Sequence, residues 1–348
     1  MSTVGIVEGF FGPEWDNNSR KSWAPFLEAH QGEFYIYAPK RDSYLRKNWR
    51  EIWPAEYITF LKDLCSHFQS HHIKFGVGFS PFGLETSLSE VDKAHLIEKG
   101  NLLKSIGIDY LGIFFDDMPV TDNLLTTQKE VIHLFEGIFP TGLIFCPSFY
   151  SYDPILDKVF GNRPVGYVEG LHQAINPSVD ICWTGPKVIS EEISEDHLVD
   201  VTELLGRKPF LWENLYANDG PRNCKFLKLK YFEGRENLLE NVSGVSFNLM
   251  NQSELSKILY LSSVFVMKGS LRPQDAFRAA CVELCGSELA DLILNSRRVF
   301  LEDGLDKLSE DDKDALINEF SHFEHACANE IVDFLRGKYL VGPECLTD

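Results

Sequence analysis

Short runs of apolar residues recur along most of the chain, and each run stops at a glycine, a proline or a polar side chain. A short continuous apolar run is typical of a strand that is buried on both faces. We expect eight such strands, over residues 4–10, 33–38, 74–80, 110–115, 142–146, 179–183, 208–212 and 243–247. Stretches whose apolar residues repeat with the period of a helix lie between them.

One of these helical stretches covers residues 92–105, and Ser87 with Glu90 predicts a capping box before it. Another is expected to begin at Ser194 and to end at Gly206, since serine favours the start of a helix and glycine its end. Strand and helix alternate in this way, without a break, to about residue 265. Eight such units predict an α/β fold of the (β/α)8 barrel type over residues 1–265.

The pattern becomes purely helical from Leu271 onward. Pro273 occupies a plausible first helical position, and the apolar stripe that follows it is closed by Gly286. Ser309 is expected to begin a second long helix. We therefore interpret residues 266–348 as a helical C-terminal region packed on the barrel.

The composition agrees with this division and narrows the class of ligand. The chain has 348 residues, 44% of them hydrophobic, and a barrel alone takes about 250 residues. A formal net charge of -19 argues against nucleic acid as a partner, because phosphates require a lysine and arginine footprint. The charge favours a neutral or cationic ligand instead.

The termini and the cysteines predict a cytoplasmic protein. No basic segment followed by an apolar core stands at the amino terminus, and no apolar run is long enough for a membrane helix, so we expect neither a signal peptide nor a membrane partner. The cysteines lie scattered in apolar segments, as buried reduced thiols do, at positions 65, 146, 182, 224, 281, 285, 327 and 345. Cys281 and Cys285 share a helical face, but no CxxC pair accompanies them, so we do not expect a zinc site.

The fourth apolar run stops at two adjacent aspartates, Asp116 and Asp117. In parallel α/β folds, chemistry sits at the carboxyl ends of the strands. Two carboxyl groups at one strand end repel each other and are partly desolvated, and both effects raise at least one pKa, which suits proton transfer near neutral pH. A helix N-cap followed by a first-turn acid would place the same residue types here.

Polar side chains stand at the ends of other strands as well. They are Lys40, Tyr150, Asn214, Asp219 and Asn248, with Trp183 and Trp212 beside them and Gly9 at the end of the first strand. Each alone is a weak signal, because asparagine and aspartate are common turn formers and a tryptophan can simply belong to the core. Together they suit one neutral sugar ring, whose hydroxyls need donors and acceptors and whose C–H faces pack on flat aromatics.

Five motifs in these segments resemble those of glycoside hydrolase family 84, which holds the O-GlcNAcases, related β-N-acetylglucosaminidases and some proteins named hyaluronidases. The motifs are GIVEGFFG (5–12), YAPK (37–40), FDD (115–117), WTGPKV (183–188) and WENLYAND (212–219). They stand in the family's order, and the resemblance covers residues 4 to about 260. It implies a retaining β-N-acetylglucosaminidase on a barrel, without a metal or an organic cofactor.

The resemblance also implies roles for individual residues. Family members use substrate-assisted catalysis, in which the 2-acetamido oxygen of the sugar attacks C1 and forms an oxazoline. By this resemblance Asp116 orients and polarises the acetamido N–H, and Asp117 is the general acid and later the base. Tyr150 lies near the reacting acetamido oxygen, and Asn214 steadies the acetamido group. The other implied contacts are Lys40 and Asp219 with distal hydroxyls, Gly9 and Asn248 with the sugar, and Thr184, Val188 and Trp212 around the acetamido group.

Several alternatives stay open on the sequence. The substrate could be an O-GlcNAc protein or an oligosaccharide from glycans or chitin, because residues that hold the terminal sugar say little about what lies beyond it. The same barrel could be a catalytically silent GlcNAc-binding protein. Asp116, Asp117 and Asp219 could instead be Mg²⁺ ligands, an interpretation with few further carboxylates to support it. An exposed apolar stripe on the helical region could mediate dimerisation, although packing on the barrel accounts for it more simply.

Overall fold

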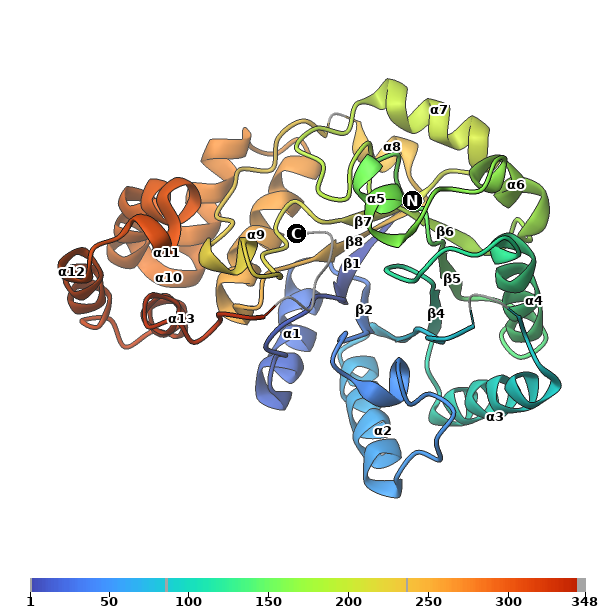
Figure 1. Ribbon diagram of the computed structural model, residues 1–348. Helices are drawn as coiled ribbons and strands as arrows, with labels where there is room; N and C mark the ends of the chain where they lie inside the picture. Colours follow the sequence, from blue (N-terminus) through green and yellow to red (C-terminus); the bar gives the residue numbers. More distant parts are fainter. Residues whose placement is uncertain (1, 85–86, 236, 343–348) are drawn as a thin grey trace.

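A closed barrel of eight parallel strands forms the centre of the molecule, with the strands in sequence order (Figure 1). The computed structural model describes residues 2–84, 87–235 and 237–342. The strands are β1 Thr3–Glu8, β2 Phe34–Tyr37, β3 Lys74–Phe79, β4 Tyr110–Phe114, β5 Leu143–Cys146, β6 Asp180–Trp183, β7 Phe210–Glu213 and β8 Gly244–Asn248. All eight predicted strands are confirmed, with ends displaced by at most two residues.

Strand β1 closes the barrel by pairing with β8 in parallel, so that Val4 lies opposite Val245. The interior is filled by side chains: a Cβ atom built at Gly78 or at Gly112 would lie 2.3 Å from the ring of Phe114. The barrel is therefore a packed core rather than a pore, as in other barrels of this type. Because all strands are parallel, their carboxyl ends meet at one end of the barrel.

Nine helices follow or connect the strands among the described residues. They are α1 Asn17–Ala29, α2 Ala55–Ser70, α3 Glu90–Ile106, α4 Leu124–Glu136, α5 Pro154–Phe160, α6 Tyr167–Ala174, α7 Glu195–Leu205, α8 Leu238–Asn241 and α9 Ser253–Met267. Helix α7 begins after Ser194 and ends at Gly206, as predicted. The capping box predicted for α3 is wrong by two residues: it is made by Ser89 and Asp92, because Ser89 has the extended backbone of an N-cap and accepts from the N–H of Asp92.

The C-terminal region is helical throughout the residues described there. Its helices are α10 Pro273–Arg298, α11 Gly304–Lys307, α12 Glu310–Phe320 and α13 Ala326–Leu335, with a π-helical turn at Val299–Asp303. Pro273 opens α10 as predicted, and Gly286 interrupts this helix with φ 75° and ψ 165°. The single long helix predicted from Ser309 is wrong: the helix ends at Phe320, and His325 caps the start of α13 by accepting from the N–H of Cys327.

These helices form a lobe on one side of the barrel, with α10 packed along α9 (Figure 1). Arg297 on α10 donates to the carbonyl of Leu229 at 2.6 Å, and its guanidinium lies 3.7 Å from the ring centre of Tyr231. Leu229 and Tyr231 belong to the connection between β7 and β8, so the lobe contacts a barrel loop. The boundary predicted at residue 265 falls inside α9 and stays a prediction.

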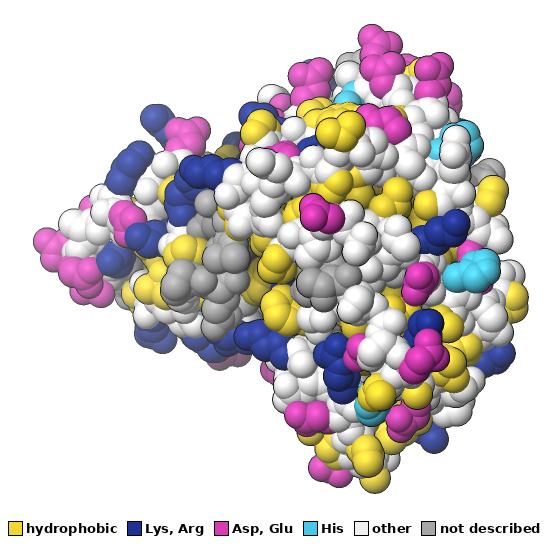
Figure 2. All heavy atoms as spheres, turned by 45° about the vertical axis from the view of Figure 1, so that its right-hand side comes forward, with side chains coloured by type: hydrophobic (Ala, Val, Ile, Leu, Met, Phe, Trp, Pro, Cys, Tyr) yellow, Lys and Arg dark blue, Asp and Glu magenta, His cyan; other side chains and the backbone are white. Residues whose placement is uncertain are grey.

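The surface carries the excess of negative charge. Figure 2 shows acidic side chains spread over both the barrel and the helical lobe rather than gathered in one patch. None of the helices within the described ranges combines the length and the apolar character that crossing a membrane would need.

Candidate active site

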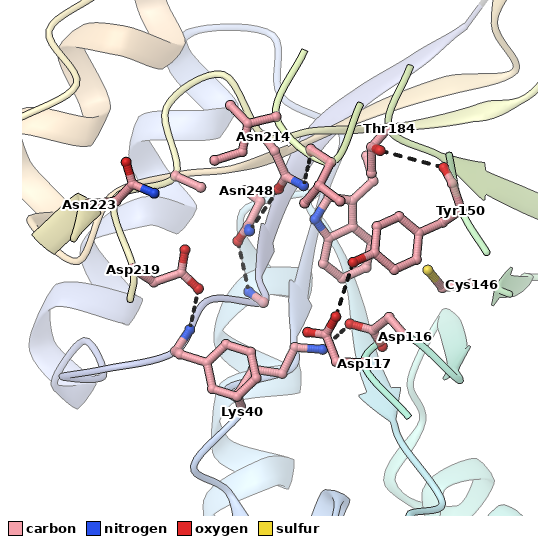
Figure 3. A pocket seen from close by; sticks show the side chains of 16 residues that line it. Lys40, Asp116, Asp117, Cys146, Tyr150, Thr184, Asn214, Asp219, Asn223 and Asn248 are labelled. Atoms are coloured by element: carbon pink, nitrogen blue, oxygen red, sulfur yellow. Dashed lines mark hydrogen bonds and ion pairs between the residues drawn. The ribbon is translucent and has the colours of Figure 1, made fainter. Parts of the chain in front are cut away.

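The eleven residues to which the family resemblance gives a role all line one pocket at the carboxyl ends of the strands (Figure 3). This pocket holds about 550 Å³ and opens to solvent. It is lined by Gly9, Lys40, Asp116, Asp117, Tyr150, Thr184, Val188, Trp212, Asn214, Asp219 and Asn248, together with Phe11, Cys146, Ile189, Ala217 and Asn223. Segments far apart in the sequence are thus brought together because parallel strands end at the same edge.

Asp116 is a buried carboxylate with one oxygen in an ion pair and the other without a partner. Its Oδ2 pairs with Nζ of Lys40, whose side chain is only 4% exposed. Its Oδ1 is buried and accepts no hydrogen bond from any described residue. A buried acceptor without a donor is costly, so this oxygen is suited to accept an N–H or O–H from a bound ligand. The structure therefore places Lys40 on Asp116, whereas the resemblance implied a contact with distal hydroxyls.

Asp117 has the left-handed backbone conformation, with φ 56°, which is uncommon for a residue other than glycine. Arg46 donates from Nη2 to its backbone carbonyl at 3.4 Å. Burial, followed by the charge of Asp116, raises the pKa of the Asp117 carboxyl, while Lys40 and Arg46 oppose this rise. The direction is the one expected for the pair: the charge of Asp116 favours the protonated form of its neighbour.

Tyr150 lies against Asp117 from the end of β5. Its hydroxyl donates to Oδ1 of Asp117 at 3.0 Å, and burial raises the pKa of this phenol well above its usual value, so it remains a donor. The backbone N–H of Thr184 donates to the carbonyl of Tyr150 at 2.9 Å, which links this loop to the one after β6. The tyrosine hydroxyl is thereby held within reach of the same ligand atoms as Asp117 (Figure 3).

A chain of amides crosses another wall of the pocket. The N–H of Gly9 donates to Oδ1 of Asn248 at 3.3 Å, and Nδ2 of Asn248 donates to Oδ1 of Asn214 at 3.0 Å. Nδ2 of Asn214 in turn donates to the carbonyl of Val188 at 2.9 Å. This series of hydrogen bonds fixes the orientation of both asparagine side chains. Because each side-chain amide carries two N–H groups, each asparagine keeps a second donor.

Asp219 stands in the loop after β7 and accepts the N–H of Phe11 at 2.8 Å through Oδ2. Burial, opposed by this hydrogen bond, raises the pKa of Asp219 to about 6. Arg235 holds the base of the same loop, since it donates to Glu213 at 2.8 Å and also to the carbonyl of Ser190 in the loop after β6. One buried arginine therefore links two pocket loops, through an ion pair with Glu213 and a hydrogen bond to Ser190.

Trp212 is the aromatic wall of the pocket, whereas Trp183 is not. A Cβ atom at Gly9 would lie 2.5 Å from the Trp212 ring, so the glycine makes room for this indole. Trp183 is fully buried outside the pocket and donates from its ring N–H to His197 at 3.0 Å, so the prediction that both tryptophans frame the site is wrong for Trp183.

Five pocket residues were not singled out from the sequence: Phe11, Cys146, Ile189, Ala217 and Asn223. The first four stand within or next to the strand-end segments already discussed, so extending each motif by a few positions would have found them. Asn223 lies further along the loop after β7, and no local pattern marks it. Arg46 was missed as well, because its link to Asp117 depends on how two loops pack.

Among the described residues, the acidic side chains of the pocket do not bring three ligand atoms as close together as a metal site needs. Within the described ranges, three histidine, cysteine or acidic ligand atoms lie within 4.8 Å of one another only in a group elsewhere, which contains neither Asp116, Asp117 nor Asp219. Lys40 occupies the position beside Asp116 where a cation would bind. This geometry does not favour the Mg²⁺ interpretation.

Comparison with known proteins identifies the family to which the chain is similar. A family model described as beta-N-acetylglucosaminidase matches residues 4–293. The proteins named Protein O-GlcNAcase from Rattus norvegicus and Mus musculus are each 30% identical to the chain over 259 residues, which is 70% of this chain and 27% of the relative. The chain thus spans about a quarter of the length of these curated relatives.

A solved structure of a mutant O-GlcNAc hydrolase from Thermobaculum terrenum has a similar fold. The TM-score is 0.77 at 28% sequence identity, over 97% of this chain and 75% of that chain. The similarity therefore extends beyond the barrel into the C-terminal helices.

Proposed function

The chain belongs to the β-N-acetylglucosaminidase family, and from this premise we propose that it is a retaining exo-β-N-acetylglucosaminidase assisted by the 2-acetamido group of its substrate. The observation that carries the proposal is the unequal state of the two adjacent aspartates. Asp116 is ion-paired and has one unpartnered buried oxygen, and Asp117 has a raised pKa. One is built to accept a hydrogen bond and the other to donate a proton.

In the first step, the acetamido oxygen attacks C1 while Asp117 gives its proton to the glycosidic oxygen and the bond to the leaving group breaks. Oδ1 of Asp116 accepts the acetamido N–H, which makes the carbonyl oxygen a better nucleophile. Water then attacks C1, the bond between C1 and the acetamido oxygen breaks, and Asp117 accepts a proton from the attacking water. Two adjacent residues suit this division, because they serve neighbouring atoms of one substrate rather than opposite faces of C1.

The other pocket residues hold the sugar in the same proposal. Tyr150 donates near the reacting acetamido oxygen, and Asn214 steadies the acetamido group beside Thr184, Val188 and Trp212. Asp219, Lys40, Gly9 and Asn248 contribute the remaining sugar contacts, with Lys40 acting also through Asp116. The similarity to O-GlcNAcases supports a protein O-GlcNAc substrate, and oligosaccharides from glycans or chitin are the alternative.

The location in the cytoplasm belongs to the proposal as well. Seven cysteines in the described residues are free thiols, which supports a reducing compartment. Cys345 lies outside the described residues.

The test is hydrolysis of an aryl β-N-acetylglucosaminide, with the matching β-glucoside as a second substrate. We expect turnover of the N-acetyl sugar alone, and its loss in Asp117→Asn, which removes the proton donor but keeps the shape. Asp122→Asn is the matched control, because Asp122 is an exposed acid in the same loop. Equal turnover of the glucoside, or full activity of Asp117→Asn, would contradict the proposal.

Two further measurements separate the alternatives. Binding of GlcNAc without any turnover would make the protein a silent binder. Loss of turnover in a chelator, with the fold intact, would favour the Mg²⁺ interpretation. If the enzyme is active, comparing an O-GlcNAc peptide with a chitin disaccharide identifies the aglycone.

A further inference from the structure

Two cysteines and a histidine meet in the helical lobe, away from the sugar pocket. The ligand atoms of Cys285, His325 and Cys327 all lie within 4.8 Å of one another. Cys285 ends the first half of α10, and the other two residues start α13. No local motif marks Cys285 as a ligand in the sequence, because His325 and Cys327 are brought to it only by the packing of two helices.

The break in α10 builds one half of this cluster. Gly286 has φ 75°, a conformation that glycine adopts at little cost, and a Cβ atom there would meet nothing within 4 Å. The glycine is therefore required by the backbone turn and not by crowding. The turn breaks the regular helical backbone directly after Cys285, and the carbonyl of Leu284 accepts from Nε2 of His325 at 3.1 Å.

The hydrogen bonds of His325 decide which ring nitrogen can bind a metal. The backbone N–H of Cys327 donates to Nδ1 at 3.2 Å, so the ring proton must be on Nε2, where it faces the carbonyl of Leu284. Nδ1 therefore carries the lone pair. Metal-binding histidines typically donate their second N–H to a carbonyl or carboxylate in this way, which fixes the tautomer.

The two thiols complete a set of soft ligands. Cys285 and Cys327 are hydrogen-bonded to each other through their sulfur atoms, and this contact together with burial raises the pKa of Cys327. Cys327 is buried, whereas Cys285 and His325 are half-exposed, which leaves a path for an ion from solvent. Thiolates and imidazole select zinc over the hard cations Mg²⁺ and Ca²⁺.

We propose that Cys285, Cys327 and Nδ1 of His325 bind a Zn²⁺ ion that joins α10 to α13. Binding exchanges two thiol protons, released to solvent, for one divalent cation, so the net charge of the site stays at zero. Nδ1 exchanges its hydrogen bond from the Cys327 N–H for the metal. With three protein ligands, the fourth tetrahedral position takes water. The ion joins two helices of the lobe that contacts the β7–β8 connection, and it is independent of the proposed reaction.

The test uses Co²⁺ as a spectroscopic substitute for Zn²⁺ on the reduced, metal-free full chain. We expect one Co²⁺ per chain, with a thiolate charge-transfer band in the near ultraviolet and visible bands of tetrahedral cobalt, all displaced by Zn²⁺. Cys285→Ser and Cys327→Ser should lose the charge-transfer intensity. His325→Asn keeps a side-chain oxygen that can accept the N–H of Cys327 at the start of α13, but it removes the imidazole. This variant should bind Co²⁺ at least tenfold more weakly.

Cys281→Ser is the matched control, because Cys281 stands one turn before Cys285 on the same helix but is absent from the cluster. Should the cysteine variants fail to fold, the wild-type chain still decides the matter: Zn²⁺ should protect Cys285 and Cys327 from alkylation and raise the melting temperature. The absence of a charge-transfer band in the wild type would overturn the proposal. A band lost equally in Cys281→Ser, or a Cys285–Cys327 disulfide that forms in preference to metal binding, would overturn it too.

Discussion

At the scale of single residues, two identical side chains at adjacent positions differ because their surroundings differ. Lys40 pairs with Asp116, whereas Asp117 faces Tyr150 and has a backbone held by Arg46. Burial and the neighbouring charge of Asp116 raise the pKa of Asp117. The proposed division between an N–H acceptor and a proton donor follows from this asymmetry.

The pH dependence of turnover tests this asymmetry. Because Asp117 must be protonated to act as the acid, activity should fall as the pH rises through its raised pKa, giving the alkaline limb of a bell-shaped profile that belongs to the coupled pair. Arg46 lowers the pKa of Asp117, so Arg46→Gln should move this limb to higher pH. A flat profile from acid to neutral pH, or a limb that moves the other way, would count against the dyad.

Removing the hydroxyl of Tyr150 tests the donor beside Asp117. Tyr150→Phe keeps the ring and its packing but removes the bond at 3.0 Å. We expect kcat to fall by roughly tenfold to a thousandfold, the range for one oriented hydrogen bond in a transition state. Tyr152→Phe is a suitable control, since Tyr152 is exposed and does not line the pocket. Unchanged turnover of Tyr150→Phe would remove this residue from the reaction.

At the scale of elements, the C-terminal helices complete the barrel helix that precedes them. Helix α9 has no side-chain cap of its own at Gln252. Glu330 of α13 replaces that cap, because its carboxylate accepts the N–H groups of Glu254 and Leu255 at 3.0 and 2.9 Å. A helix of the lobe thus satisfies backbone donors of the barrel.

The contribution of this cap can be measured by denaturant unfolding. Glu330→Ala leaves two backbone donors of α9 without their acceptor and should destabilise the protein by about 1–2 kcal/mol. Glu330→Gln keeps one carbonyl oxygen and should lose less. If both variants unfold like the wild type, the contact between α13 and α9 contributes no net stability.

At the scale of the whole molecule, the lobe and the barrel share contacts through α9 and the β7–β8 connection. Arg297 donates to Leu229, and the N–H of Leu227 donates to the carbonyl of Phe300 at 3.2 Å. The family match also continues through residue 293. The same connection begins with the loop that carries Asn214 and Asp219, so the lobe supports one wall of the pocket.

Truncation tests whether the barrel is independent of the lobe. A chain that ends after residue 268 would expose the apolar side of α9 that α10 covers. We expect this product to be insoluble or to lack a cooperative thermal transition, while the full chain unfolds in one transition. A soluble truncated chain with full hydrolase activity would show instead that the boundary near residue 265 separates two autonomous domains.

The barrel and the residues of its pocket were predictable from the sequence because the signals are local. An apolar run marks a strand whatever surrounds it, and a closed parallel barrel necessarily brings the carboxyl ends of its strands together. Asp116, Asp117, Asn214 and Asn248 could therefore be assigned to one site. Their roles in the reaction stay predictions.

The tertiary structure alone decided the features that depend on side chains from distant segments. Lys40 pairs with Asp116, Trp183 belongs to the core, and Gly9 makes room for Trp212. The meeting of Cys285 with the start of α13 is of the same kind. Period and composition describe one segment at a time, whereas ion pairs, indole packing and ligand clusters are set by how two segments approach each other.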